Sequence, residues 1–175
     1  MLTPVSRSRL FSIIAVCLVL IAVGLLYFRS ASGTSGPRTL IGSPAASFTL
    51  PATVGPPRGL TDFRGHIVVL NLWASWCPPC RAEMPDLQRF WLANRKSGIV
   101  VVGVDEGESA IAAATFAHSL GVTYPILIDE DQRYGRVYSA LGLPTTTIID
   151  RNGVVRAAFD GPVTQAQLSE NVKGL

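Results

Sequence analysis

An apolar run, HIVVLNLWA at residues 66–74, constrains the fold of this chain more than any other feature. It is rich in β-branched residues and lacks strict polar–apolar alternation, which is typical of a central strand covered on both faces. A second run of this kind, GIVVVGVD, lies at 98–105. A helical segment at about 78–96 separates the two runs, starting with proline in its first turn and stopping near Gly98. The pattern therefore predicts parallel strands joined by a helix.

Short β-type and helical segments alternate through the rest of the body. The tripeptide RNG at 151–153 is a tight-turn signal that predicts an antiparallel hairpin, and Thr164 with Gln167 forms a capping-box pattern that opens a helix. The segments are strands at 47–50, 124–129, 144–150 and 154–159, helices at 109–120, 132–141 and after Thr164, and a turn-rich loop at 53–59. The order β, α, β, α, β, α, β, β, α predicts an α/β sandwich with mostly parallel central strands and an antiparallel edge.

The first part of the chain has a different character. Residues 10–28, LFSIIAVCLVLIAVGLLYF, carry no charge and no proline, and as a helix they would be about 28 Å long, close to the thickness of a bilayer core. Arg7 and Arg9 precede the run, which favours a cytoplasmic N-terminus and an extracytoplasmic body. A removed signal peptide stays an alternative, because small residues follow at 30–33.

These features predict four parts of the chain. A cytoplasmic N-terminus at 1–9, a transmembrane anchor at 10–28 and a flexible Ser/Gly/Pro-rich linker at 29–45 precede a folded domain at 46–175. The first 43 residues contain four basic and no acidic side chains, so the net charge of +3 comes from this leader and the domain is nearly neutral. A nucleic-acid binder would carry clustered positive charge on its folded part, and that function is not favoured.

Cys77 and Cys80 form the motif CPPC directly after the first apolar run. As a structural staple, a disulfide between them would close a very short loop and stabilise by roughly 2 kcal/mol, against nearly 5 kcal/mol for a loop of about 100 residues. A structural zinc site needs four N or S ligands. Beyond the leader the chain offers these two cysteines with His66 and His118, in no usual zinc spacing. The third alternative is a dithiol that exchanges disulfides.

Redox exchange fits the local chemistry best. Cys77 is expected at the N-cap of the helix, where free N–H groups and the helix dipole stabilise a thiolate that attacks a disulfide. Cys80 lies one turn further in and is placed to resolve the mixed disulfide, so Cys77 is expected exposed and Cys80 shielded. Pro78 and Pro79 lack N–H donors, which predicts that the pKa of the Cys77 thiol is lowered only modestly.

The segment NLWASWCPPCRAEMPDL at 71–87 resembles the active site of thioredoxin-fold proteins, specifically the membrane-anchored TlpA/ResA/DsbE-like thiol:disulfide oxidoreductases. The likeness continues in GLTDFRGHIVVLNLWASWC, VVGVDE and LGLPTTTIIDRNG and covers most of residues 44–160. It implies a thioredoxin-like three-layer sandwich, with a mixed central sheet flanked by helices, behind an N-terminal transmembrane helix. It also implies activity outside the cytoplasm that is commonly reductive and often serves cytochrome c maturation.

Further site residues follow from the resemblance. Pro144 matches the family's cis-proline beside the CxxC, which leaves the Leu143 backbone free to pair with an incoming peptide; a trans proline opening an edge strand is the alternative. Glu83 matches a glutamate that tunes or relays the thiol protons, and an exposed carboxylate near Arg81 is its alternative. Trp76 is expected to shield the cysteines and shape the docking surface.

Asn71 stands where cytoplasmic thioredoxins carry a buried acid, so an acid–base role would fall to Glu83. The motif requires no cofactor beyond the cysteine pair and no metal. The expected partners of a monomeric, membrane-anchored enzyme are exported thiol or disulfide proteins, such as apocytochrome c, and a membrane electron donor. A same-fold oxidant of folding proteins and a non-catalytic copper-delivery or scaffold module stay open as alternatives. A peroxidase of the peroxiredoxin type would need a Pro-Thr-Cys pattern upstream, which the chain lacks.

Overall fold

The fold is built around a five-stranded sheet with the strand order β5-β4-β3-β6-β7. The computed structural model describes residues 41–138 and 142–175. The strands β3, β4 and β5 are parallel, whereas β6 runs antiparallel to both β3 and β7, so the predicted mixed sheet with an antiparallel edge is confirmed. The bounds are β3 Ile67–Trp73, β4 Ile99–Glu106, β5 Ile126–Asp129, β6 Thr145–Ile149 and β7 Val155–Asp160.

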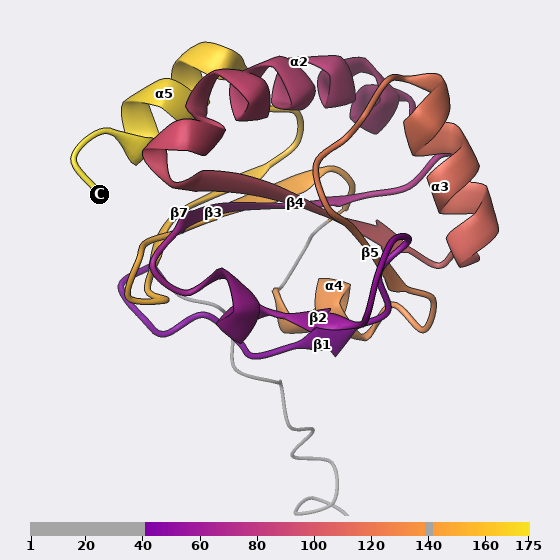
Figure 1. Ribbon diagram of the computed structural model, residues 1–175, viewed down its shortest axis with the longest axis horizontal. Helices are drawn as coiled ribbons and strands as arrows, with labels where there is room; N and C mark the ends of the chain where they lie inside the picture. The colour runs from indigo at the N-terminus through magenta and orange to yellow at the C-terminus, as the bar shows by residue number, and fades with distance from the viewer. Residues whose placement is uncertain (1–40, 139–141) are drawn as a thin grey trace, which may run out of the picture. The chain divides into compact units, whose positions relative to one another are not determined.

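Both faces of the sheet are covered, as the apolar runs predict. Three helices lie on one face, α2 (Pro78–Asn94), α3 (Ala110–Ser119) and α5 (Gln165–Val172), and the small elements β1, β2 and α4 lie on the other (Figure 1). All seven residues of β3 are buried, with Val69 and Trp73 facing the helices and Leu70 facing the opposite layer. Since α2 follows β3 in the chain, the N-terminus of α2 lies beside the C-terminal end of the central strand.

Local signals of the sequence explain where the elements begin and end. The α-helix α2 starts at Pro78, and the 3₁₀ turn after it ends at Gly98, whose φ of 77° is left-handed and suits glycine. Thr164 and Gln167 form the expected capping box at the start of α5. The hairpin between β6 and β7 closes through a hydrogen bond from the Asp150 N–H to the Val154 carbonyl.

The layer opposite the helices differs from the prediction. The expected edge strand at 47–50 is reduced to β1 (Thr49–Leu50), which pairs with β2 (Arg58–Gly59) in a separate two-stranded sheet, although 53–59 was predicted as a loop. The pairing depends on glycine at 59, because a Cβ there would lie 2.5 Å from the Phe48 carbonyl oxygen. A 3₁₀ helix at Leu60–Phe63 follows directly.

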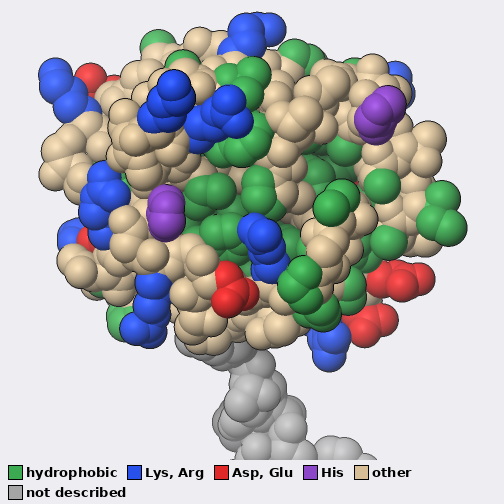
Figure 2. All heavy atoms as spheres, in the orientation of Figure 1, with side chains coloured by type: hydrophobic (Ala, Val, Ile, Leu, Met, Phe, Trp, Pro, Cys, Tyr) green, Lys and Arg blue, Asp and Glu red, His purple; other side chains and the backbone are tan. Residues whose placement is uncertain are grey.

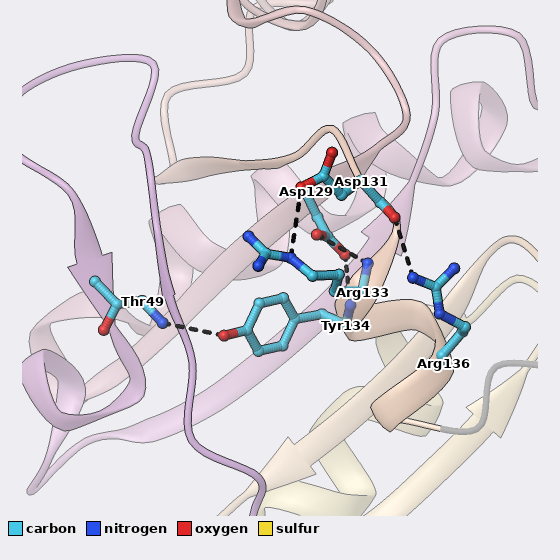
Figure 3. Close-up of polar contacts among 6 residues, drawn as sticks. All are labelled: Thr49, Asp129, Asp131, Arg133, Tyr134 and Arg136. Atoms are coloured by element: carbon cyan, nitrogen blue, oxygen red, sulfur yellow. Dashed lines mark hydrogen bonds and ion pairs between the residues drawn. The ribbon is translucent and has the colours of Figure 1, made fainter. Parts of the chain in front are cut away.

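The helix α4 (Arg133–Val137) is shorter than the predicted 132–141, of which residues 139–141 lie outside the described part. Asp129 at the end of β5 accepts hydrogen bonds from the backbone N–H groups of Arg133 (3.1 Å) and Tyr134 (2.6 Å), and the Tyr134 hydroxyl accepts one from the Thr49 N–H (3.3 Å; Figure 3). These bonds connect α4 both to β5 of the central sheet and to β1.

The predicted transmembrane run at 10–28 lies outside the described residues. Within 41–138 and 142–175 no helix has both the length and the apolar character needed to cross a bilayer.

A cavity of about 540 Å³ lies near the N-terminal end of β5, between the loop at 52–58, α3 and the end of α2. Trp91, Tyr124 and Ile126 contribute apolar wall, and Arg58 and His118 add basic groups. In the orientation of Figure 1, hydrophobic side chains line a hollow near the centre of the viewed face, with basic side chains close by (Figure 2). Because β3, β4 and β5 are parallel, this cavity is at the opposite edge of the sheet from the cysteines, which follow the C-terminal end of β3.

Candidate active site at the start of α2

Cys77 and Cys80 form a disulfide at the N-terminus of α2, with their Cα atoms 5.3 Å apart. Cys77 is the N-cap residue, and its Sγ accepts a hydrogen bond from the Cys80 N–H at 3.3 Å. The predicted N-cap position is thus confirmed. Pro78 and Pro79 occupy the first two helical positions and supply no N–H, so the Cys80 amide is the first donor of the helix that can reach the sulfur.

The burial of the two cysteines agrees only in part with the prediction. Cys80 is fully buried, as expected for a resolving thiol, but Cys77 is only 3 % exposed, so its expected exposure is wrong for the disulfide form. The Cys77 N–H donates to the Ala74 carbonyl at 3.2 Å, and this turn folds the residue against the core on the helical face. Trp76, 62 % exposed, presents the aromatic surface beside the disulfide instead.

The peptide bond between Leu143 and Pro144 is cis, as the resemblance implies. Leu72 pairs with Thr145 in the β3–β6 ladder, so Pro144 lies opposite the end of β3, where the chain leaves for the cysteines. Leu143 is half-buried and packs against the core cluster that contains both cysteines. Its backbone N–H and carbonyl form no hydrogen bond within the described residues, which leaves them available to an extended peptide.

Glu83 is buried on α2, so the alternative of an exposed carboxylate is excluded. Its Oε1 accepts a hydrogen bond from Asn71 Nδ2 at 2.8 Å, and its Oε2 accepts one from the Val163 N–H at 2.9 Å. Burial raises the pKa of Glu83 above its ordinary value, while the bonds from Val163 and Asn71 oppose the rise. Asn71 lies beneath this carboxylate in place of an acid and also donates to the Thr146 hydroxyl.

Three further polar residues of the site were missed in the sequence. Glu108, in the loop after β4, accepts hydrogen bonds from both the N–H and the hydroxyl of Ser75, each at 2.6 Å. Asp105 at the end of β4 is fully buried and lies next to Trp73 in the parallel ladder. A signal existed: the acidic string DEGE covers the end of a buried strand parallel to β3 and the loop after it, so it reaches the same edge of the sheet as the cysteines.

The other candidates show no contact with the two sulfurs among the described hydrogen bonds and ion pairs. His66 and His118 are exposed, and Arg81 stacks over the Phe116 ring at 5.4 Å. Trp73 is fully buried in the core. Across 41–138 and 142–175, no group of three His, Cys, Asp or Glu side chains is arranged to hold a metal ion.

A sequence model of the AhpC/TSA family matches residues 41–158. A curated relative, the thiol-disulfide oxidoreductase ResA of Geobacillus kaustophilus, is 32 % identical over 170 residues, which is 97 % of each chain. This chain belongs to the ResA-like thiol-disulfide oxidoreductases. ResA of Bacillus subtilis is 33 % identical over 166 residues, covering 94 % of this ResA-like chain and 92 % of that protein.

Solved structures agree with the ResA-like assignment. A DsbE-type thiol:disulfide interchange protein of Chlorobium tepidum superposes with a TM-score of 0.72 at 29 % identity, covering 76 % of this chain and 95 % of that one. StoA of Bacillus subtilis gives a TM-score of 0.64 at 26 % identity, covering 75 % and 99 %. The thioredoxin-like fold and the TlpA/ResA/DsbE-like resemblance are therefore confirmed, and the redox group of this ResA-like enzyme is the Cys77–Cys80 disulfide.

Proposed function

We propose that this ResA-like enzyme is a membrane-anchored, monomeric reductant of disulfides in exported proteins, with apocytochrome c as the leading client class. One observation carries the proposed roles of the cysteines. The sulfur of Cys77 caps α2 and receives the Cys80 N–H, while Cys80 is fully buried one turn behind it. This arrangement stabilises a thiolate on Cys77 and protects Cys80 from outside disulfides.

The proposed reaction starts from the dithiol form. The Cys77 thiolate attacks one sulfur of the client disulfide, forms a mixed disulfide and releases the other client sulfur as a thiolate. The Cys80 thiol then loses its proton, and the resulting thiolate attacks Cys77 Sγ, which forms the Cys77–Cys80 disulfide and releases the second client sulfur as a thiolate. Two electrons pass from the enzyme to the client, and the client thiolates take up two protons. A membrane electron donor would return two electrons to the disulfide.

Other residues fit defined steps of this reaction. Glu83 is a buried acid on α2, one helical turn after Cys80. Its raised pKa suits it to exchange protons with the resolving thiol. The backbone of Leu143, which has no hydrogen bond within the described residues, would bind the client segment beside Pro144 as a short β-pair, and Trp76 would pack against it. The extracytoplasmic location is supported by the apolar run at 10–28 with Arg7 and Arg9 before it.

Two cysteine variants of the full-length chain test the proposal. Cys77→Ser should abolish the reduction of insulin disulfides, and Cys80→Ser should retain the client as a stable mixed disulfide on Cys77. Cys17→Ser is the matched control, because this third cysteine lies in the leader. Capture of exported proteins with a CxxCH haem-attachment motif would support the client class.

The direction of electron flow needs a separate measurement. A redox-buffer titration should give a potential near the reducing end of the thioredoxin-fold range, about −270 mV, whereas a value near −120 mV would favour the oxidant alternative. Full activity of Cys77→Ser, or stoichiometric copper binding by the reduced protein without disulfide exchange, would favour the scaffold alternative.

A further inference from the structure

A carboxylate from a neighbouring loop holds the segment that leads into Cys77. Glu108 accepts the Ser75 N–H with Oε2 and the Ser75 hydroxyl with Oε1, both at 2.6 Å. Two short bonds from one residue to one carboxylate form a bidentate, charge-assisted contact, which is stronger and more directional than a single neutral bond. Only Trp76 separates Ser75 from Cys77, so this contact helps to determine where the N-cap sulfur lies.

A second carboxyl group lies behind Glu108. Asp105 occupies the position opposite Trp73 in the β3–β4 ladder and is fully buried. Neither of its oxygens receives a hydrogen bond of good geometry from a described N–H or O–H group, although the nearby Glu108 N–H acts to lower its pKa. Its side chain interacts instead with the Glu108 carboxylate, which is itself an acceptor. Asp105 is buried and Glu108 is half-buried, and two carboxyl groups in contact at such a place are stabilised when one of them keeps a proton.

We propose that Glu108 is a positioning residue of the active site, which holds the loop before Cys77 through Ser75 while the neighbouring Asp105 carries the shared proton. The proposal deepens the proposed function, because it rests on Cys77 as the attacking residue. Protonated Asp105 donates its O–H to Glu108, and Glu108 then keeps its negative charge for the two Ser75 donors. Loss of the proton leaves two carboxylates in contact, and their repulsion loosens the hold on Ser75.

The charges around the pair agree with this division. Burial, followed by the hydrogen bond and charge of Glu108, raises the pKa of Asp105 to about 8. Burial also acts to raise the pKa of Glu108, but the hydrogen bonds from Ser75 and from Asp105 outweigh it and leave that pKa below the ordinary value. Glu106, whose own pKa is raised to about 7 by burial and by the charge of Asp129, adds a further negative charge near Asp105 when it is ionised. The titratable groups on helix α2 are Cys80, Arg81, Glu83, Asp86 and Arg89, and Cys77 is its N-cap.

In the disulfide form the titration of Asp105 can be measured without interference from the cysteine thiols. In the oxidised, ¹⁵N-labelled full-length chain in detergent micelles, Cys77 and Cys80 do not titrate. The amide resonance of Ser75 should then move with a midpoint near pH 8. In Asp105→Asn the side-chain amide can donate to Glu108 permanently, so the same resonance should be constant between about pH 6.5 and pH 9.5.

Activity variants give a second readout at pH 7. Glu108→Ala should lower the second-order rate constant of the reduced enzyme toward a disulfide by about ten-fold or more, because a displaced reacting group loses rate steeply. Ser75→Ala keeps the backbone bond and should lose less, and Glu108→Gln should lie between Glu108→Ala and the wild type. Glu170→Gln, an exposed carboxylate on α5, is the matched control and should leave the rate unchanged.

A constant Ser75 resonance in the wild type, or an unchanged rate and Ser75 resonance in Glu108→Ala, would overturn the proposal. If Glu108→Ala does not fold, the rate of Glu108→Gln and the pH titration of the Ser75 resonance in the wild type still test the proposal. The titration of the Ser75 resonance needs no client protein. A wild type without reductase activity would therefore contradict the proposed function, while the titration would still test the contact of Glu108 with Ser75.

Discussion

Asn71 donates through Nδ2 to Glu83 Oε1 at 2.8 Å, which joins the middle of β3 to α2 just beyond Cys80. The second oxygen of Glu83 is bonded to the Val163 N–H, so one buried carboxylate connects the central strand, the catalytic helix and the segment before α5. An asparagine does not titrate, so Glu83 is the acid at this place. In the proposed mechanism, proton exchange beneath the cysteines would therefore depend on a residue of the helix and not of the strand.

Glu83→Gln removes the titrating group with little change of shape. Asn71 Oδ1 has no hydrogen-bond partner in the described part of the chain, so a flipped Asn71 amide can bind the glutamine and the fold should be retained. We expect the resolving step to slow by about 100-fold, the lower range for loss of a general acid–base. Rapid acid quenching should show a longer-lived mixed disulfide. An unchanged lifetime, with Glu170→Gln as control, would remove Glu83 from the proton path.

Asp105→Asn should change how stability depends on pH. The pKa of Asp105 is raised to about 8 in the folded state, against 3.8 as the ordinary value. Between these values the folded state binds more protons than the unfolded state, so the free energy of unfolding falls as pH rises and the fall ends near pH 8. Urea unfolding at pH 5 and pH 8 should show a smaller loss in the variant, by about 1 kcal/mol or more. Parallel losses would contradict the buried neutral acid.

Trp76→Ala should separate client binding from chemistry. Trp76 is largely exposed beside the disulfide, so its loss should change the free energy of unfolding by no more than about 0.5 kcal/mol. We expect KM for a protein disulfide to rise several-fold, while the rate with a small thiol such as dithiothreitol stays within about two-fold. Ile111→Ala, an exposed apolar residue on α3, is the control. Equal effects on both substrates would place Trp76 in packing instead of docking.

Much of the central sheet could be predicted because its strands carry their own signal. The runs at 66–74 and 98–105 are apolar throughout, and the structure buries both faces of β3. The pairing of β1 with β2 could not be predicted, since two strands of two residues have no periodicity and depend on Gly59 approaching the Phe48 carbonyl.

The residues of the candidate site also fall into those that the sequence predicts and those that it does not. The N-cap position of Cys77 follows from adjacent residues, and the cis-proline from a local motif. The bond from Val163 to Glu83 spans 80 positions, and the contact of Glu108 with Ser75 spans 33. Both depend on the register of the sheet and on where loops return, which a single sequence does not specify. The buried position of Cys77 was missed because the turn to Ala74 folds it inward.

Pro79→Ala should make the Cys77 thiol more acidic. Pro79 is the second residue of α2, a position whose N–H normally bonds the N-cap side chain, and proline supplies none. The variant adds one donor to the Cys80 N–H that already reaches the sulfur. A hydrogen bond to a charged group contributes about 1.5 kcal/mol, so the pKa of Cys77 should fall by about one unit. Iodoacetamide alkylation rates between pH 4 and pH 9 measure this value.

The same change should shift the redox balance, because a stabilised thiolate favours the reduced form. The reduction potential should become less negative by about 30 mV, which corresponds to one pKa unit in a two-electron couple. Pro78→Ala is the matched control, since the N–H of the first helical position is directed away from the N-cap sulfur and should leave both values nearly unchanged. Equal shifts in the two variants would assign the effect to a loosened helix start, whereas a shift in Pro79→Ala alone would show that the missing donor keeps Cys77 only weakly acidic.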